Sequence, residues 1–131
     1  MITQDQLPML AIASMNDNHL EEMLLVQKLD SVARANDLDE VAKVLEEYVE
    51  HSIKHFADEE KLMKEADFPD YLTHKGEHDR HIKELKAFIR YFEKNRDPKA
   101  IYTHIEGGLS PWILHHMKTM DTEAADFLKT K

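Results

Sequence analysis

Residues 41–63, VAKVLEEYVEHSIKHFADEEKLM, decide the fold class, because apolar and histidine positions recur there every three or four residues. That spacing follows one face of an α-helix and does not match the alternation of a half-buried strand. The positions on this face are Val41, Val44, Leu45, Tyr48, Ser52, His55, Glu59, Leu62 and Met63. The stretch therefore predicts a long helix whose inner face carries polar side chains among apolar ones.

Three further stretches show the same periodicity, and residues that break helices separate them. Only 3 Gly and 4 Pro occur in 131 residues, so the elements should be few and long. The expected helices cover about 17–35, 38–65, 70–94 and 111–128. We therefore predict one all-α domain over residues 1–131, a four-helix bundle with short connections and an irregular N-terminal arm.

Two local signals mark the expected helix starts. Asp37 followed by Glu40 is typical of an N-cap with its capping-box partner. Ser110 before Pro111 is typical of an N-cap followed by proline in the first turn. The second signal predicts that the chain from about 95 to 110 is a connection.

The composition excludes several classes of protein. The formal net charge of −9 argues against nucleic acid and against an anionic membrane as the partner. The absence of cysteine excludes disulfide frameworks, Cys-ligated zinc, iron–sulfur clusters and thiol catalysis. No apolar run approaches the roughly 18 residues of a membrane span. The N-terminus lacks the basic start of a secretory signal, so we expect a cytoplasmic protein.

Five of the 9 histidines, with two carboxylates, fall at inner positions of the expected helices. His55 and Glu59 are four residues apart, as are His74 and His78, so each pair shares one helix face. Imidazole with carboxylate and no sulfur suits first-row metals such as iron, manganese and zinc. Seven ligands are too many for one ion, so two ions sharing two carboxylates is the natural count. The candidate ligands are His19, His55, Glu59, His74, His78, His116 and Asp121.

The spacing of His116 and Asp121 is unusual for two ligands of one site. They are five residues apart, which on a regular helix separates them by about 140°. Either a local widening of the helix or a long bridging reach is needed to direct both side chains at one site. Such bulges are frequent at functional sites.

Several segments, in this order along the chain, resemble the hemerythrin family. They are Met15-Asn16-x-x-His19, His55-Phe56-x-x-Glu59-Glu60-x-x-Met63, Phe68-Pro69, His74-Lys75-x-x-His78 and Trp112-Ile113-x-x-His116-x-x-x-x-Asp121. The resemblance runs from about residue 15 to 128. Asn16 stands where the family commonly has Asp, and Ile113 where it usually has leucine.

The resemblance implies an up-down-up-down bundle around a non-haem di-iron centre. His74, His78 and His116 would hold one iron and His19 and His55 the other, with Glu59, Asp121 and an oxo or hydroxo group as bridges. The iron with fewer ligands would bind O2, and Phe56, Trp112 and Ile113 match apolar positions of the O2 pocket. The implied function is reversible O2 binding for carriage, storage or scavenging, more a binding protein than an enzyme. An oxygen-consuming protein would be the recipient, and we expect no further domain after the fourth helix.

Glu22 departs from the family pattern. It follows His19 by three residues, where the family usually has an apolar residue lining the O2 pocket. A carboxylate facing the pocket would favour an alternative function, a di-iron peroxidase or oxidase or a nitric-oxide-reactive centre. Glu22 could equally face solvent, since Glu21 precedes it and Met23 can take the inward position.

Three other functions remain open on the residues alone. His74-Lys75-Gly76-Glu77-His78 matches the H-x-x-E-H pattern of inverted zinc proteases, although a bundle offers no sheet to hold a peptide. Ferritin-like di-iron proteins use more carboxylates than this chain provides. A metal-free interaction bundle would leave the inward histidines unexplained.

The remaining histidines are expected outside the ligand set. For His81 a hydrogen bond to a carboxylate or a water next to the metals is one possibility, but the sequence assigns no role to His81 or to His51. We expect His104 and His115 at the surface and Glu60 on a solvated face of its helix, about 100° round from Glu59.

Overall fold

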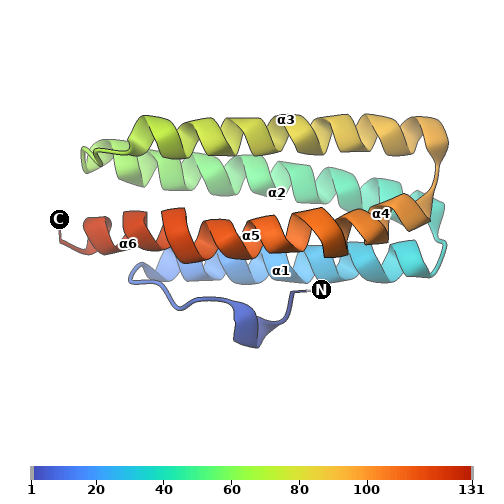
Figure 1. The fold of residues 1–131 in the computed structure, drawn as a ribbon, viewed down its shortest axis with the longest axis horizontal. Helices are drawn as coiled ribbons and strands as arrows, with labels where there is room; N and C mark the ends of the chain where they lie inside the picture. Colours follow the sequence, from blue (N-terminus) through green and yellow to red (C-terminus); the bar gives the residue numbers. More distant parts are fainter. Residues whose placement is uncertain (1, 131) are drawn as a thin grey trace.

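The computed structural model describes residues 2–130 and contains four long helical rods packed side by side (Figure 1). The first three rods are α1 (Ala13–Arg34), α2 (Leu38–Glu65) and α3 (Tyr71–Asn95). The fourth rod consists of α4 (Pro98–His104), α5 (Ser110–His116) and α6 (Thr122–Lys129), joined by π-helical turns at Ile105–Leu109 and Met117–Asp121. Consecutive rods run in opposite directions in Figure 1, so the predicted up-down-up-down four-helix bundle is confirmed.

Short polar connections fix this antiparallel order. The carboxylate of Asp37 accepts a hydrogen bond from the backbone N–H of Glu40 at 3.3 Å, which confirms the predicted N-cap of α2. Arg96 ends α3 in the left-handed region at φ 50°, and the side chain of Asp97 then caps α4 by accepting from the N–H of Lys99. Connections this short leave successive rods as antiparallel neighbours.

Two predicted helix boundaries were wrong. Helix α1 begins at Ala13 rather than near residue 17, and the fourth rod begins at Pro98 rather than near residue 111. Gly107 and Gly108 lie inside the π-helical turn instead of ending a helix. The wide turn already interrupts the regular hydrogen-bond ladder, so Pro111, which has no N–H to donate, follows it without breaking the rod.

The same extension changes the surroundings of two residues assigned to the connection. Ser110 is not an N-cap; its hydroxyl is buried and has no hydrogen-bond partner among residues 2–130. His104 belongs to α4 and is exposed, as is His115, so the surface location predicted for both is confirmed.

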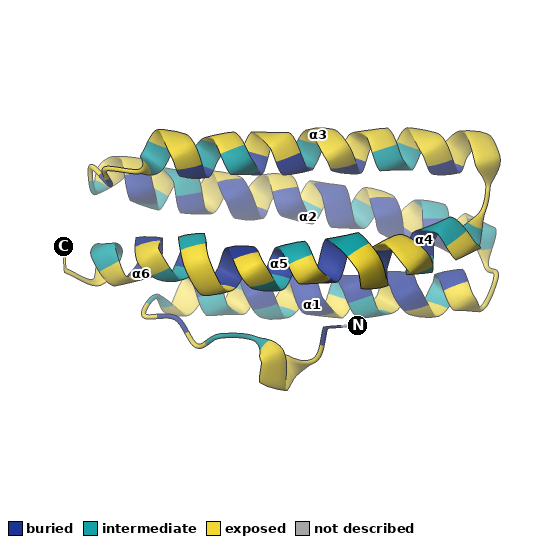
Figure 2. Cartoon of the chain, in the orientation of Figure 1, coloured by how far each residue is buried: buried dark blue, intermediate teal, exposed yellow. Residues whose placement is uncertain are grey.

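Polar residues divide the core of the bundle into two apolar parts. Figure 2 shows buried residues along the inner faces of the rods and exposed residues outside. The larger apolar part, toward the C-terminal end of α1, includes Val26, Leu29, Val41, Val44, Leu45, Phe92, Ile101 and Ile105. At the other end two small clusters contain Met63, Phe68 and Ala124, and Leu10, Met15 and Ala125. Between them the buried side chains are mostly polar, and such groups cost several kcal/mol each unless something satisfies them.

The N-terminal arm is anchored to the bundle by its two ends. Ile2 is fully buried in the larger apolar core, and its carbonyl accepts a hydrogen bond from Gln27 at 2.9 Å. The Asn16 side chain accepts from the N–H of Leu10 at 2.8 Å and donates to the Leu10 carbonyl at 2.9 Å. An aspartate could not make the second bond, so the asparagine suits this contact.

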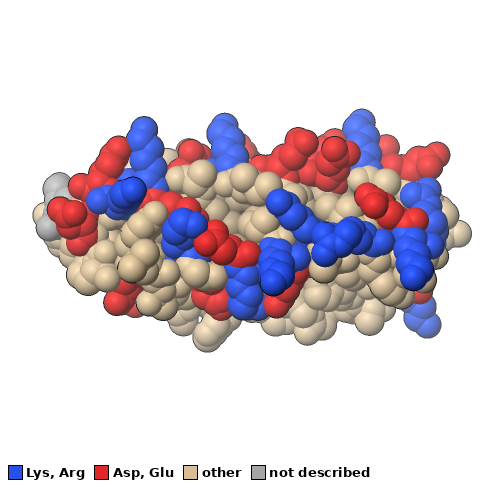
Figure 3. Space-filling model, turned by 90° about the horizontal axis from the view of Figure 1, so that it is seen from above, with Lys and Arg blue, Asp and Glu red and all other residues tan. Residues whose placement is uncertain are grey.

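The outer surface carries charges of both signs. Lys and Arg side chains are interspersed with Asp and Glu on the face shown in Figure 3. Within residues 2–130, none of the helices has the length and the apolar character that a membrane span requires.

Candidate metal centre

All seven candidate ligands point into the polar zone between the two apolar parts. They come from all four rods: His19 from α1, His55 and Glu59 from α2, His74 and His78 from α3, and His116 and Asp121 from the fourth rod. Each is 5% exposed or less. Side chains up to 102 residues apart in sequence thus meet in one buried place.

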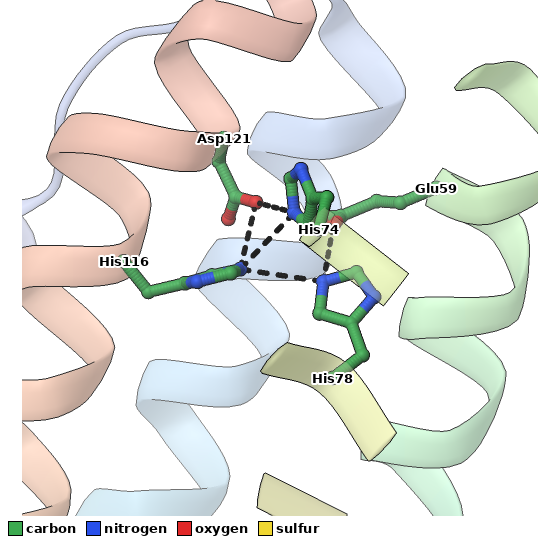
Figure 4. Close-up of side chains that lie close together, drawn as sticks. All are labelled: Glu59, His74, His78, His116 and Asp121. Atoms are coloured by element: carbon green, nitrogen blue, oxygen red, sulfur yellow. Dashed lines mark hydrogen bonds and ion pairs between the residues drawn. The ribbon is translucent and has the colours of Figure 1, made fainter. Parts of the chain in front are cut away.

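Three histidines form the first group of candidate ligands (Figure 4). Nε2 of His116 lies 3.2 Å from Nε2 of His74 and 3.3 Å from Nε2 of His78. Asp121 Oδ1 lies 3.0 Å from His74 Nε2 and 3.1 Å from His116 Nε2. Glu59 Oε1 lies 3.3 Å from His78 Nε2. All five donor atoms therefore surround one small volume.

Two histidines form the second group with the same carboxylates. Nε2 of His19 lies 2.9 Å from Asp121 Oδ2, and Nε2 of His55 lies 2.6 Å from Glu59 Oε2. Each carboxylate thus directs one oxygen at the three-histidine group and the other at the two-histidine group. This is the arrangement that two cations with two bridging carboxylates require.

The spacing of the donor atoms suits metal coordination better than direct hydrogen bonding between the side chains. Ligands held at about 2.1 Å from a metal, at angles near 90–110°, lie about 3.0–3.4 Å apart, which matches the nitrogen–nitrogen distances. Nε2 of His116 faces Nε2 of both His74 and His78, and its single lone pair can accept a hydrogen bond from only one of them at a time. Glu59 Oε1 is buried and has no hydrogen-bond partner among the described residues. Imidazole and carboxylate together suit iron, manganese or zinc.

The π-helical turn explains how His116 and Asp121 reach the same site. Hydrogen bonds over five residues in Met117–Asp121 widen the turn, which places residues five apart on the same side of the rod. Of the two routes that the spacing left open, the structure shows the local widening.

The site keeps its carboxylates ionised. Burial alone would raise the pKa of Asp121, but hydrogen bonds from His116, His19 and His74 outweigh it and hold this pKa well below its usual range. Burial likewise opposes a charge on His19, yet hydrogen bonds to Asp121 and Glu59 raise the pKa of its imidazole to about 10. Ionised carboxylates are the metal-binding form, and a cation that binds here must displace protons from histidine.

Comparison with known proteins agrees with this geometry. The family described as the hemerythrin HHE cation binding domain matches residues 10–128. The chain belongs to the hemerythrin family. A bacteriohemerythrin of Aquifex aeolicus (strain VF5) is 28% identical over 114 residues, 87% of each chain. A bacteriohemerythrin of Stenotrophomonas maltophilia (strain R551-3) is 34% identical over 89 residues, 68% of this chain and 56% of its own. The crystal structure of a wild-type hemerythrin superposes with a TM-score of 0.83 at 20% identity, covering 98% of this chain and 97% of that one.

One contact of this hemerythrin site was missed from the sequence. Glu60 is half-buried, and its Oε2 lies 2.9 Å from Nδ1 of His78, so it does not lie on a solvated face as predicted. The contact crosses from α2 to α3, and no periodicity within α2 could reveal it. A carboxylate on the outer nitrogen fixes the ring so that Nε2 faces the site.

Glu77, the base in the zinc-protease alternative, lies outside both ligand groups of the hemerythrin bundle. It accepts hydrogen bonds from the Arg80 guanidinium at 3.0 Å. The zinc-protease hypothesis requires Glu77 to act as a base beside the metal and a sheet to hold the peptide. Glu77 is instead paired with Arg80 in an all-helical bundle, so the H-x-x-E-H pattern does not support that function.

Aromatic rings cover the three-histidine group. The Phe56 ring stacks on His78 with centroids 3.9 Å apart, and half-buried Trp112 stacks on His116 at 4.8 Å. His81 packs against the Trp112 indole at 3.8 Å, and its Nε2 has no hydrogen-bond partner among residues 2–130. Of the two partners considered for His81, a carboxylate is therefore not in contact with this nitrogen. Ile113 is buried in the larger apolar core.

Glu22 faces the interior of the hemerythrin bundle. It is 3% exposed, and its Oε2 accepts a hydrogen bond from the Tyr48 hydroxyl at 2.8 Å. Of the two orientations that the sequence allowed, the structure shows the inward one. The sequence could not separate them, because positions three and four after His19 flank its face almost equally.

Proposed function

We propose that this protein binds O2 reversibly at a non-haem di-iron centre. His74, His78 and His116 would hold one iron, and His19 and His55 the other, with Glu59 and Asp121 bridging them. The observation that carries the proposal is that each carboxylate offers one oxygen to each histidine group.

The unequal number of histidines gives the site its place for an exogenous ligand. The first group offers three imidazoles and two carboxylate oxygens, whereas the second offers two of each. A pair of ferrous ions would supply the two electrons that reversible O2 binding requires. The side that carries His19 and His55 has one protein ligand fewer, so we place the O2 position there.

The surrounding side chains protect the ligands from water. Phe56 is 4% exposed and lies against His78, with His55 at a centroid distance of 5.3 Å. Trp112 stacks on His116 from one turn earlier on the same helix, α5, and Ile113 is 1% exposed. Exclusion of water from the site by these side chains favours release of unreacted O2 over irreversible oxidation of the metals.

Glu22 supports a second candidate function. A buried carboxylate one helical turn from the ligand His19 could accept or deliver a proton during reduction of O2 or of a peroxide, which a purely apolar pocket cannot do. The hydrogen bond from Tyr48 holds Glu22 inward and is the observation that favours this alternative.

Visible spectroscopy of the iron-loaded protein separates the two functions. The protein is reduced without oxygen, exposed to O2 and then returned to anaerobic buffer. Reversible binding predicts an absorption band that appears with O2 and disappears on its removal through several cycles. A single, irreversible passage to the oxidised spectrum would favour reductive chemistry, and a chain that binds no iron would reject both.

A further inference from the structure

We infer that Glu22 makes the exogenous-ligand position selective by charge, so that it accepts neutral ligands and rejects small anions. The inference rests on the proposed di-iron site and names the class of ligand that this site takes. Dioxygen, nitric oxide and hydrogen peroxide are neutral at physiological pH, whereas azide and nitrite are anions.

The first observation is that the Glu22 carboxylate has a fixed position. Its Oε2 accepts the 2.8 Å hydrogen bond from the hydroxyl of Tyr48, whose ring is 1% exposed within the larger apolar core. Burial, with the negative charge of Glu22 next in size, raises the pKa of Tyr48 well above its usual value. The phenol therefore stays protonated and acts as the donor, and Glu22 remains the acceptor.

The second observation is that this carboxylate lies one helical turn from a metal ligand. Glu22 follows His19 by three residues on the same face of α1, and Tyr48 lies seven residues before His55 on the inner face of α2. The rings of His19 and His55 lie 5.4 Å apart, so the two-histidine group adjoins this turn of α1. The charge of Glu22 is therefore close to the side on which we place the exogenous ligand.

The third observation is that no cationic side chain neutralises Glu22. Among residues 2–130, no Lys, Arg or His nitrogen lies within ion-pair distance of its carboxylate, whereas exposed Glu21 lies 3.6 Å from His51 Nδ1. Within the described part of the chain, the Glu22 carboxylate therefore has no counter-ion.

The consequence follows from Coulomb's law in a poorly solvated site. Like charges a few ångströms apart repel far more strongly there than in water, while a neutral ligand is not repelled. The buried charge of Glu22 therefore weakens binding of an anion to the same metal that accepts a neutral ligand.

Azide is the probe that tests this selection. The iron-loaded, oxidised protein is titrated with sodium azide, and the dissociation constant is read from the absorption change. We expect Glu22→Gln, which keeps the shape and removes the charge, to bind azide about tenfold tighter or more. Glu22→Leu removes the charge without adding a hydrogen-bond donor and should tighten binding as well. Glu21→Gln removes an exposed charge from the adjacent position and should change the constant by less than about twofold.

Two further comparisons make the result decisive. Tyr48→Phe keeps the charge of Glu22, so its azide binding should stay weak. Nitric oxide binding to the reduced protein should be equal in wild type and Glu22→Gln.

Equal azide affinity in wild type, Glu22→Gln and Glu22→Leu would overturn the inference, as would tighter azide binding in the glutamine variant alone. Iron is counted first, so that a chain without two irons rejects the proposed function, whereas a loaded chain without the azide difference rejects only this inference.

Discussion

Asp121 Oδ2 lies 2.9 Å from Nε2 of His19, although 102 residues separate the two in the sequence. The other oxygen of Asp121 lies 3.0 Å from Nε2 of His74. One side chain at the end of a π-helical turn thus faces both histidine groups and joins the first rod of the bundle to the last. The site is therefore built by the packing of the whole bundle and not by any one helix.

Removal of the other bridging carboxylate should release iron. Glu59→Ala takes one oxygen from each histidine group, so we expect the iron retained after anaerobic loading and desalting to fall from two per chain to one or none. Asp58→Ala changes the exposed neighbour on the same helix and should keep both irons. Retention of two tightly bound irons by Glu59→Ala would reject the bridging role.

The carboxylate behind His78 should affect metal affinity without affecting the fold. Glu60→Ala frees Nδ1 of His78 and lets the ring reorient, so we expect metal affinity to fall about 10–100-fold. The helical circular dichroism should not change. Glu46→Ala, an exposed substitution on the same helix, serves as the control. A metal affinity equal to that of wild type would show that Glu60 does not orient the ligand.

The N-terminal arm should depend on the amide of Asn16. Asn16→Asp loses the hydrogen bond to the Leu10 carbonyl and places a carboxylate against that oxygen, so we expect a loss of about 1–3 kcal/mol in unfolding free energy. Urea denaturation of the metal-free protein measures it. Asn18→Asp, two residues away, should change stability by less than about 0.5 kcal/mol. Equal losses in both variants would mean that the arm contact contributes nothing specific.

His81 should make the stability of the bundle depend on pH. Burial, assisted by the positive charges of His116 and Arg80, lowers the pKa of His81 to about 3. When the pH drops below the ordinary pKa of histidine, the unfolded chain takes up a proton at His81 and the folded chain does not. The contribution of His81 to stability is therefore complete above that pKa and is lost as the pH decreases below it. Between pH 7.5 and 5 the wild type should lose about 2 kcal/mol more than His81→Phe.

Urea denaturation of both metal-free proteins at the two pH values checks this difference. The other titrating groups are common to both chains, so the comparison isolates His81. Parallel losses in the two proteins would show that His81 does not titrate in this range.

The sequence predicted best what lies within one helix. His55 with Glu59 and His74 with His78 follow from the four-residue repeat alone, and hydrophobic periodicity predicted the bundle. The π-helical turn at Met117–Asp121 was expected from the five-residue spacing as one of two routes. In contrast, Gly107 and Pro111 suggested a break, because the other π-helical turn that accommodates them has no signature in a helical pattern.

Contacts between helices were harder to predict. The bond of Glu60 to His78 and that of Tyr48 to Glu22 depend on how α2 sits against α3 and α1, which periodicity does not determine. The direction of Glu22 was undecided for the same reason. A buried carboxylate needs a hydrogen-bond partner, and that of Glu22 is Tyr48 on another helix, 26 residues away in the sequence.

Low-temperature electron paramagnetic resonance of the iron-loaded, oxidised wild-type protein, with iron counted in the same sample, tests the central claim most directly. Two ferric ions held by Glu59 and Asp121 would couple antiferromagnetically through the bridging groups, so that their spins cancel. The account predicts two irons per chain and no ferric signal. Fewer than two irons, or a ferric signal that accounts for most of the iron, would contradict it.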